Sequence, residues 1–116
     1  MGLFQKGDFT AASGQRLTWK IAADALDHED WHCLAFVASQ MLPAFGSVEG
    51  VPSGGIRFAN ALRQYVTEGP LLIAEDVVTT GGSMERVRAG RPAIGVVAFC
   101  RGVCPSWVIP VFQLNQ

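Results

Sequence analysis

The sequence predicts an α/β domain of three layers, with a mainly parallel sheet of about four strands and a small N-terminal hairpin. Two apolar runs, 71–74 and 93–99, are unbroken, as in strands that are buried on both faces. Two glycine-rich segments, 49–55 and 79–83, each follow an expected strand and precede an expected helix. Strands that alternate with helices in this way favour a parallel sheet with helices packed on it.

The composition indicates one compact globular domain. Of the 116 residues, 49% are apolar and 16% are charged, which is enough for a single hydrophobic core. The net charge of −1 and the lack of a basic run predict no nucleic-acid partner. No apolar stretch is long enough to span a bilayer, and the N-terminus has no signal-peptide core. We therefore expect a cytoplasmic protein that has no membrane partner.

The three cysteines, Cys33, Cys100 and Cys104, are predicted to be reduced thiols. Their number is odd, and the C-x3-C spacing of the last two offers too few ligands for a zinc site. Reduced thiols are also what a cytoplasmic location favours.

A helix is predicted to follow Asp27, which would act as its N-cap. Asp30 lies three residues later and would complete a capping box, and Pro43 ends the helix. His28 and His32 lie mostly off the apolar stripe, which predicts surface histidines rather than ligands. The apolar stripe has i, i+3, i+4 spacing and consists of Trp31, Leu34, Ala35, Ala38, Met41 and Leu42.

The remaining elements are predicted from local patterns. A Ser-Gly-Gln turn between two extended segments predicts the hairpin. Gly90 and Pro92 close a short helix, and Pro110 predicts that the last strand lies at a sheet edge. The expected ranges are hairpin strands at 9–12 and 16–21, a strand at 44–48, a helix at 56–66, a strand from 71, a helix at 84–89, and strands at 93–99 and 107–112.

The polar residues after the apolar run at 71–74 predict a ligand site. Two carboxylates, Glu75 and Asp76, would hold sugar hydroxyls or a hydrated divalent cation. The hydroxyls and glycines of 79–83 suit a phosphate at the start of the next helix. Together these groups predict a site for ribose 5-phosphate. The alternative is an ordinary strand-to-helix loop with two solvated acids.

This order of hydrophobic strand, two acids and Thr/Gly-rich loop resembles the phosphoribosyl pyrophosphate (PRPP) motif of type I phosphoribosyltransferases. The resemblance implies that Glu75 and Asp76 are catalytic and hold Mg²⁺ through water. It departs from many members at Glu75, where they carry a shorter Asp. No lysine follows the glycines, so this is not a Walker A loop. The 5-phosphate ligands implied are Val78, Thr79, Thr80, Gly81, Gly82 and Ser83.

The segment 49–55 resembles the pyrophosphate loop of the same family, which has the form G-V-P-x-G-G in some members. A glycine-dense turn between a strand and a helix presents successive backbone N–H groups to an anion. Taken alone, such a loop is more often a structural turn. The resemblance also implies an unusual peptide conformation here. The implied ligands of pyrophosphate, together with Mg²⁺, are Val51, Pro52, Ser53, Gly54 and Gly55.

Residues 7–21 resemble the N-terminal hood of orotate phosphoribosyltransferases, which covers the base pocket. The resemblance implies a hood at 1–27, a PRPP-binding core at 28–116, and Trp19, Lys20 and Arg101 as base-binding residues. Lys20 would replace the lysine that members often carry at the position of Ala12, and Cys100 replaces an acid beside Arg101. The alternatives are a hairpin tryptophan with a solvated lysine, and an arginine that caps a strand end.

The family's long mobile loop, which carries Lys, Arg and His residues, is missing, because only Thr67-Glu68-Gly69-Pro70 precedes the strand at 71. Mg²⁺, the two loops and Arg57 or Lys20 would then balance the charge of the leaving pyrophosphate. We expect a homodimeric phosphoribosyltransferase that moves ribose 5-phosphate from Mg–PRPP to a base, orotate or a related pyrimidine. The alternatives are a non-catalytic PRPP or nucleotide-monophosphate sensor and a nucleoside-phosphate hydrolase.

Overall fold

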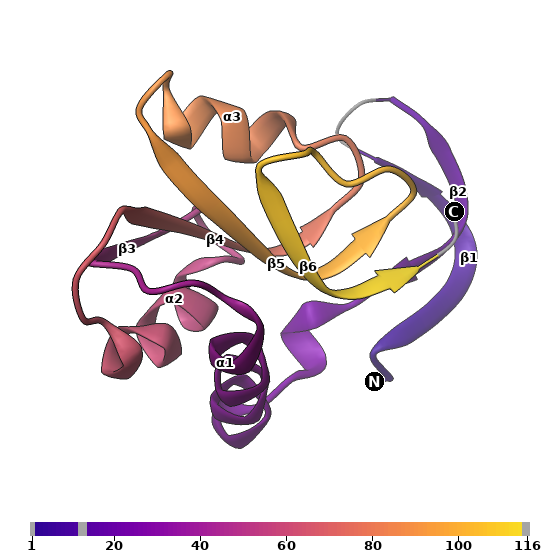
Figure 1. Ribbon diagram of the computed structural model, residues 1–116. Coiled ribbons are helices and arrows are strands. Elements are labelled where there is room, and N and C mark those ends of the chain that lie inside the picture. The colour runs from indigo at the N-terminus through magenta and orange to yellow at the C-terminus, as the bar shows by residue number, and fades with distance from the viewer. Residues whose placement is uncertain (1, 12–13, 115–116) are drawn as a thin grey trace.

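The computed structural model describes residues 2–11 and 14–114 (Figure 1). The strands β3, β4, β5 and β6 form one sheet in that order, and every neighbouring pair is parallel. The predicted fold class, a mainly parallel sheet of four strands with an N-terminal hairpin, is therefore confirmed. In chain order, with η for a 3-10 helix, the elements are β1 (Phe4–Thr10), β2 (Arg16–Ile21), η1 (Ala23–Ala25), α1 (His28–Met41), β3 (Ser47–Gly50), α2 (Ile56–Leu62), η2 (Arg63–Tyr65), β4 (Leu71–Val78), α3 (Gly82–Arg88), β5 (Ala93–Arg101) and β6 (Val108–Leu114).

Helices cover both faces of the sheet and give the three predicted layers. In Figure 1, α1 and α2 lie on one face and α3 lies on the other. Side chains of β4 alternate between the two faces, so that Leu72 and Ala74 join the larger hydrophobic cluster with α1 and α2. Ile73, which lies between them, joins the smaller cluster with α3. Within the described part of the chain, none of the helices has both the length and the apolar character needed to cross a membrane.

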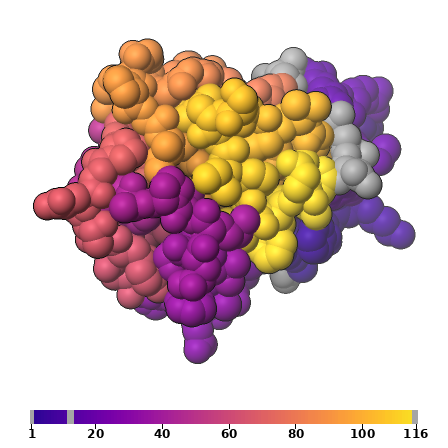
Figure 2. All heavy atoms as spheres, in the orientation of Figure 1, coloured from indigo at the N-terminus to yellow at the C-terminus, as the bar shows by residue number. Residues whose placement is uncertain are grey.

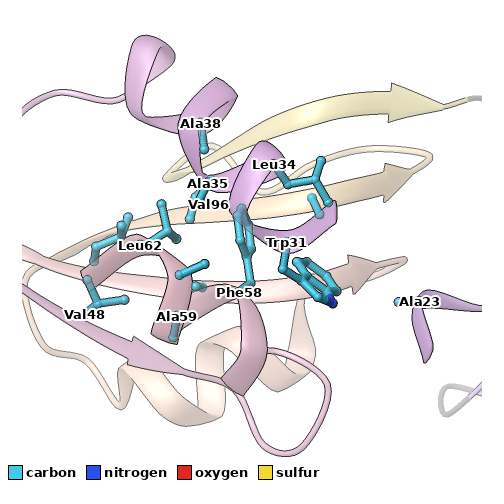
Figure 3. Close-up of a cluster of buried hydrophobic side chains, with 14 of the residues drawn as sticks. Ala23, Trp31, Leu34, Ala35, Ala38, Val48, Phe58, Ala59, Leu62 and Val96 are labelled. Carbon is cyan, nitrogen blue, oxygen red and sulfur yellow. The ribbon is translucent and has the colours of Figure 1, made fainter. Parts of the chain in front are cut away.

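The capping box of α1 forms as predicted. The Asp27 carboxylate accepts a hydrogen bond from the Asp30 backbone N–H, and the Asp30 carboxylate accepts one from that of Asp27. Met41, the last helical residue, has the spacing of the apolar stripe but is 45% exposed, because the buried part of the stripe stops before it. The buried stripe, which packs on α2 and the sheet (Figure 3), consists of Trp31, Leu34, Ala35 and Ala38.

The N-terminal hairpin has a longer first strand than predicted. β1 begins at Phe4 rather than residue 9 and pairs with β2 in an antiparallel register that shifts between Lys6 and Phe9. Ala12, at the end of the predicted first strand, lies outside the described residues. Ile21 is buried in the larger cluster, so the end of β2 is attached to the core. The hairpin stands at the end of the sheet to which the arrowheads of the core strands point (Figure 1).

Two strands have different ends from those predicted. β4 continues through Glu75 and Asp76 to Val78, because its backbone stays paired with that of β5 up to Cys100. β3 spans Ser47–Gly50 rather than 44–48, because its backbone pairs with β4 only over these four residues. Glu49 therefore lies inside β3, and Glu75 and Asp76 lie inside β4. From the sequence pattern alone, these polar residues are expected after the strands rather than within them.

β6 is an edge strand, as Pro110 predicted. Its surface lies between α1 and α3 on the face shown in Figure 2. β6 is parallel to β5 although only residues 102–107 connect them. This connection packs on the side of α3, where Cys104 and Trp107 join the smaller cluster and Pro105 lies against Gly81. The connection therefore supports the turn between β4 and α3.

Candidate functional site

The residues predicted to bind a 5-phosphate line a single pocket at the carboxyl end of β4. The pocket has a volume of about 140 Å³. It includes all of the predicted phosphate loop, 78–83, together with Glu75 from the predicted acidic pair. A carboxyl group and a hydroxyl-rich loop thus share one small space, which suits a phosphate beside a polyhydroxyl group. The lining residues are Glu75, Val77, Val78, Thr79, Thr80, Gly81, Gly82, Ser83 and Met84.

The shape of this loop depends on Gly81. Its φ of +86° lies in the left-handed region, which residues with a side chain rarely adopt. A Cβ atom at this position would also lie 2.5 Å from Cγ of Pro105, in the connection that precedes β6. The loop is therefore held by a contact between segments that are far apart in the sequence.

The two acids of β4 have different surroundings. Glu75 is only 6% exposed, whereas Asp76 is half-buried. The Glu75 carboxyl accepts a hydrogen bond of 2.9 Å from the Asp76 backbone N–H, and Asp76 Oδ1 accepts one of 2.7 Å from Val77 N–H. Burial, together with the neighbouring Asp76 carboxyl, raises the pKa of the Glu75 carboxyl to about 9. The alternative of two solvated acids is therefore wrong for Glu75.

The predicted pyrophosphate loop lies directly beside the acidic pair. β3 and β4 are parallel, and Gly50, the last residue of β3, pairs with Ala74 of β4. The loops that follow these two strands therefore both leave the sheet at its carboxyl end. A Cβ atom on Gly54 would lie 2.2 Å from Oδ2 of Asp76, so the loop backbone touches this carboxylate. A Cβ on Gly55 would lie 2.5 Å from the Ala74 carbonyl oxygen. Gly54 and Gly55 are therefore both required for close packing of the loop on β4. In the same loop, the peptide bond between Pro52 and Ser53 is cis.

Two of the three predicted base-binding residues meet. Arg101, at the end of β5, is 2% exposed, and its Nη1 donates a hydrogen bond of 2.7 Å to the Trp19 carbonyl oxygen. Its guanidinium carbon lies 3.5 Å from the centroid of the Trp19 ring. Burial lowers the pKa of Arg101, and its Nε has no hydrogen-bond partner among the described residues. The Lys20 ammonium instead lies 4.8 Å from the centroid of the Phe9 ring.

The sequence pattern gave no role to Arg86, a cation next to the predicted phosphate loop. Its Nη2 donates a hydrogen bond of 3.2 Å to Ser83 Oγ. Arg88 and Arg91 are paired with acids, whereas no acid within 2–11 and 14–114 pairs with Arg86. The i, i+3 spacing of Ser83 and Arg86 on one helix was the available signal. Arg57, expected to help with pyrophosphate, instead donates to the Leu26 carbonyl oxygen.

The carboxylates of Glu75 and Asp76 are the groups here that could hold Mg²⁺. In the described part of the chain, no three His, Cys, Asp or Glu side chains are grouped to hold a metal ion. A Mg²⁺ ion at this pair would take its other ligands from water and from phosphate oxygens, which is how this ion commonly binds.

No family model matches the sequence, and no curated protein sequence matches it. Solved structures do match the fold. An orotate phosphoribosyltransferase from Aeropyrum pernix is 22% identical, with a TM-score of 0.75 over 97% of this chain and 88% of its own. An orotate phosphoribosyltransferase from Mycobacterium tuberculosis H37Rv is 16% identical, with a TM-score of 0.71 over 96% of this chain and 89% of its own.

The UMP synthase of Leishmania donovani is a longer protein with the same fold in part of its chain. It is 18% identical, with a TM-score of 0.73, and the match covers 97% of this chain but 34% of the synthase. At these identities the similarity establishes the fold alone. The chain therefore has the type I phosphoribosyltransferase fold that its motifs predicted.

Proposed function

We propose that the protein is a phosphoribosyltransferase that transfers ribose 5-phosphate from Mg–PRPP to a nucleobase. One observation carries this proposal. Glu75 and the loop 78–83 line one pocket, while the neighbouring Asp76 touches Gly54 of the second glycine-rich loop. Two anion-binding loops and a pair of carboxyl groups are the groups that a ribose with a phosphate at one end and a pyrophosphate at the other requires.

The reaction assigns a role to each part of the site. The loop 78–83 binds the 5-phosphate, and the loop 51–55 binds the pyrophosphate. A ring nitrogen of the base forms a bond to ribose C1 with inversion, the bond from C1 to the pyrophosphate oxygen breaks with its electron pair, and the base nitrogen loses a proton. Glu75 and Asp76 hold the ribose hydroxyls and stabilise the positive charge that develops on the ring.

The residues present fit a Mg²⁺ ion. Two carboxyl groups at the end of β4 are hard oxygen ligands, and this ion is commonly bound by one or two carboxylates with substrate phosphates. When bound, Mg²⁺ would offset the negative charge of pyrophosphate. A nearby cation would also favour the ionised form of Glu75, which burial by itself disfavours.

The buried Arg101 favours an acidic base such as orotate. It is 2% exposed and has no acidic partner in residues 2–11 and 14–114. An unpaired buried cation is costly, and the carboxylate of a ligand would compensate it. Two solved structures with a similar fold are orotate phosphoribosyltransferases, which also favours an acidic pyrimidine base as the substrate.

Turnover tests the proposal directly. Pyrophosphate release from Mg–PRPP is measured with orotate, uracil, hypoxanthine, guanine and adenine in turn. We expect release with orotate or a related pyrimidine, and a loss of about 100-fold or more in Asp76→Asn, because the transition-state charge loses its stabilising partner. The exposed Asp24 in η1 provides the matched control, Asp24→Asn, which should keep full activity.

The other outcomes contradict parts of the proposal. Release that survives in Asp76→Asn would remove the catalytic role of the acidic pair. Binding of PRPP without release for any base would identify a sensor instead of a transferase.

A further inference from the structure

A second and larger pocket is lined by residues of α1 and α2. Both helices lie on the face of the sheet opposite α3 (Figure 1). The pocket at the end of β4 has a volume of about 140 Å³, whereas the volume of this second pocket is about 200 Å³. None of its residues belongs to the candidate functional site, and none of them is an acid. The lining residues are His28, Trp31, His32, Arg57, Asn60 and Ala61.

Arg57 brings a positive charge to this pocket. Its Nη2 donates to the Leu26 carbonyl oxygen, in the segment just before α1, and this bond fixes the direction of the side chain. No carboxylate in the described part of the chain is paired with it. The remaining N–H groups of the guanidinium are therefore available to an anion.

Asn60 contributes a donor rather than an acceptor. Its Oδ1 accepts a hydrogen bond from Nη1 of Arg63, one turn along α2 and η2. This bond defines which end of the amide is the oxygen, because a guanidinium only donates. The amide nitrogen of Asn60 is the end that is left for the pocket.

The hydrogen bond between Gln64 and Nδ1 of His32 makes the other ring nitrogen of His32, Nε2, a donor. Nε2 of Gln64 donates a hydrogen bond of 3.0 Å to the Ala61 carbonyl oxygen, so this end of the amide is its nitrogen. The same nitrogen lies 3.2 Å from Nδ1 of His32, which therefore accepts. In a neutral imidazole the proton is then on Nε2, which becomes a donor. The His28 ring lies beside it, 4.3 Å between centroids.

We propose that this pocket binds a small anion that carries a phosphate group. The guanidinium of Arg57, the amide nitrogen of Asn60 and Nε2–H of His32 all donate, and no carboxylate in the pocket opposes them. A metal ion is disfavoured, because it would need an unprotonated His32 Nε2 next to a guanidinium. The phosphate is either inorganic phosphate or the phosphate of a small monoester.

The test follows the ring signals of His28 and His32 by NMR during titration with inorganic phosphate and, separately, with ribose 5-phosphate. The backbone N–H signals of Gly81 and Gly82 report binding at the candidate functional site in the same spectra. We expect the histidine signals to shift with at least one probe, with a midpoint distinct from that of the glycines. The probe with the lower midpoint identifies the source of the phosphate.

Two variants make the test specific. Asn60→Asp keeps the oxygen that Arg63 contacts but replaces the donor by a carboxylate, and Arg57→Gln removes the charge but keeps a donor for Leu26. Both should weaken the histidine response about tenfold or more and leave the glycine response unchanged. Arg16→Gln, which changes the same charge in the exposed hairpin pair with Asp8, is the control and should bind normally.

The proposal is overturned if the histidine signals do not move with either probe in the wild-type protein. It is also overturned if Asn60→Asp and Arg57→Gln both bind as Arg16→Gln does. Neither result bears on the phosphoribosyltransferase site, because the glycine signals report that site separately.

Discussion

At the level of single residues, Glu75 has the most unusual surroundings in the candidate site. The residue is 6% exposed, and its carboxyl group lies next to that of Asp76. The Glu75 carboxyl also accepts a hydrogen bond from the Asp76 backbone N–H. Burial raises the pKa of this carboxyl and so favours its neutral form, whereas a bound cation would favour its ionised form. Asp76 is more exposed and contacts Gly54, and it is the acid that our proposal places against the substrate.

This protonation predicts a pH dependence of folding. The folded-state pKa of Glu75 is raised from 4.5 to about 9, so its stabilising contribution is complete below pH 4.5 and is lost as the pH rises towards 9. In the absence of ligand, the wild-type free energy of unfolding should fall across this range relative to that of Glu75→Gln, by up to about 1.4 kcal/mol per pH unit. Urea unfolding at pH 5, 7 and 9 measures it. Parallel curves for the two proteins would show that Glu75 is ionised in the fold.

At the level of elements, the hairpin is joined to the sheet by Arg101. The residue is at the end of β5, and it contacts both the carbonyl oxygen and the ring of Trp19 in β2. Ile21 adds an apolar contact to the larger cluster. Arg101 and Ile21 together thus attach the hairpin to the end of the sheet at which it stands in Figure 1.

We expect Arg101→Gln to loosen the hairpin without unfolding the sheet. Loss of the cation–π contact and of a charged hydrogen bond should speed amide hydrogen exchange in β1 and β2 by about tenfold or more, while β4 and β5 stay protected. Arg16→Gln is the control, because Arg16 pairs with Asp8 on the surface, where such pairs contribute little. Equal exchange in both variants would mean that Ile21 and its neighbours hold the hairpin alone.

The elements also show which features the sequence could predict. The capping box of α1 depends on residues three positions apart, and it was predicted. The loop 78–83 is likewise a local pattern, and its residues line one pocket, while its binding of phosphate stays a prediction. The contact between Arg101 and Trp19 joins residues 82 positions apart, and the direction in which Lys20 points depends on the ring of Phe9. Neither is encoded in local spacing. The strand state of Glu75 and Asp76 was missed because pairing with β5 overrides the polarity of the two residues.

At the level of the whole molecule, the parallel sheet brings the parts of the site together. β3, β4 and β5 are neighbouring parallel strands, so their carboxyl ends lie together. The loop after β3, the loop after β4 and Arg101 at the end of β5 are therefore at the same end of the sheet. The helices cover the faces and leave this end to the loops and the hairpin (Figure 1). The central claim is that the two loops and the acidic pair act as one PRPP site.

The most direct test of this claim is titration calorimetry of Mg–PRPP with the wild-type protein and with Gly54→Ala. The added methyl group would lie 2.2 Å from Asp76 Oδ2, so it must displace either this carboxylate or the loop 51–55. We expect the wild-type protein to bind and Gly54→Ala to lose about 100-fold in affinity for Mg–PRPP. Inorganic phosphate, which needs only the loop 78–83, should shift the backbone N–H signals of Gly81 and Gly82 equally in both proteins. Wild-type protein that binds no Mg–PRPP, or Gly54→Ala that binds it as tightly, would contradict the account.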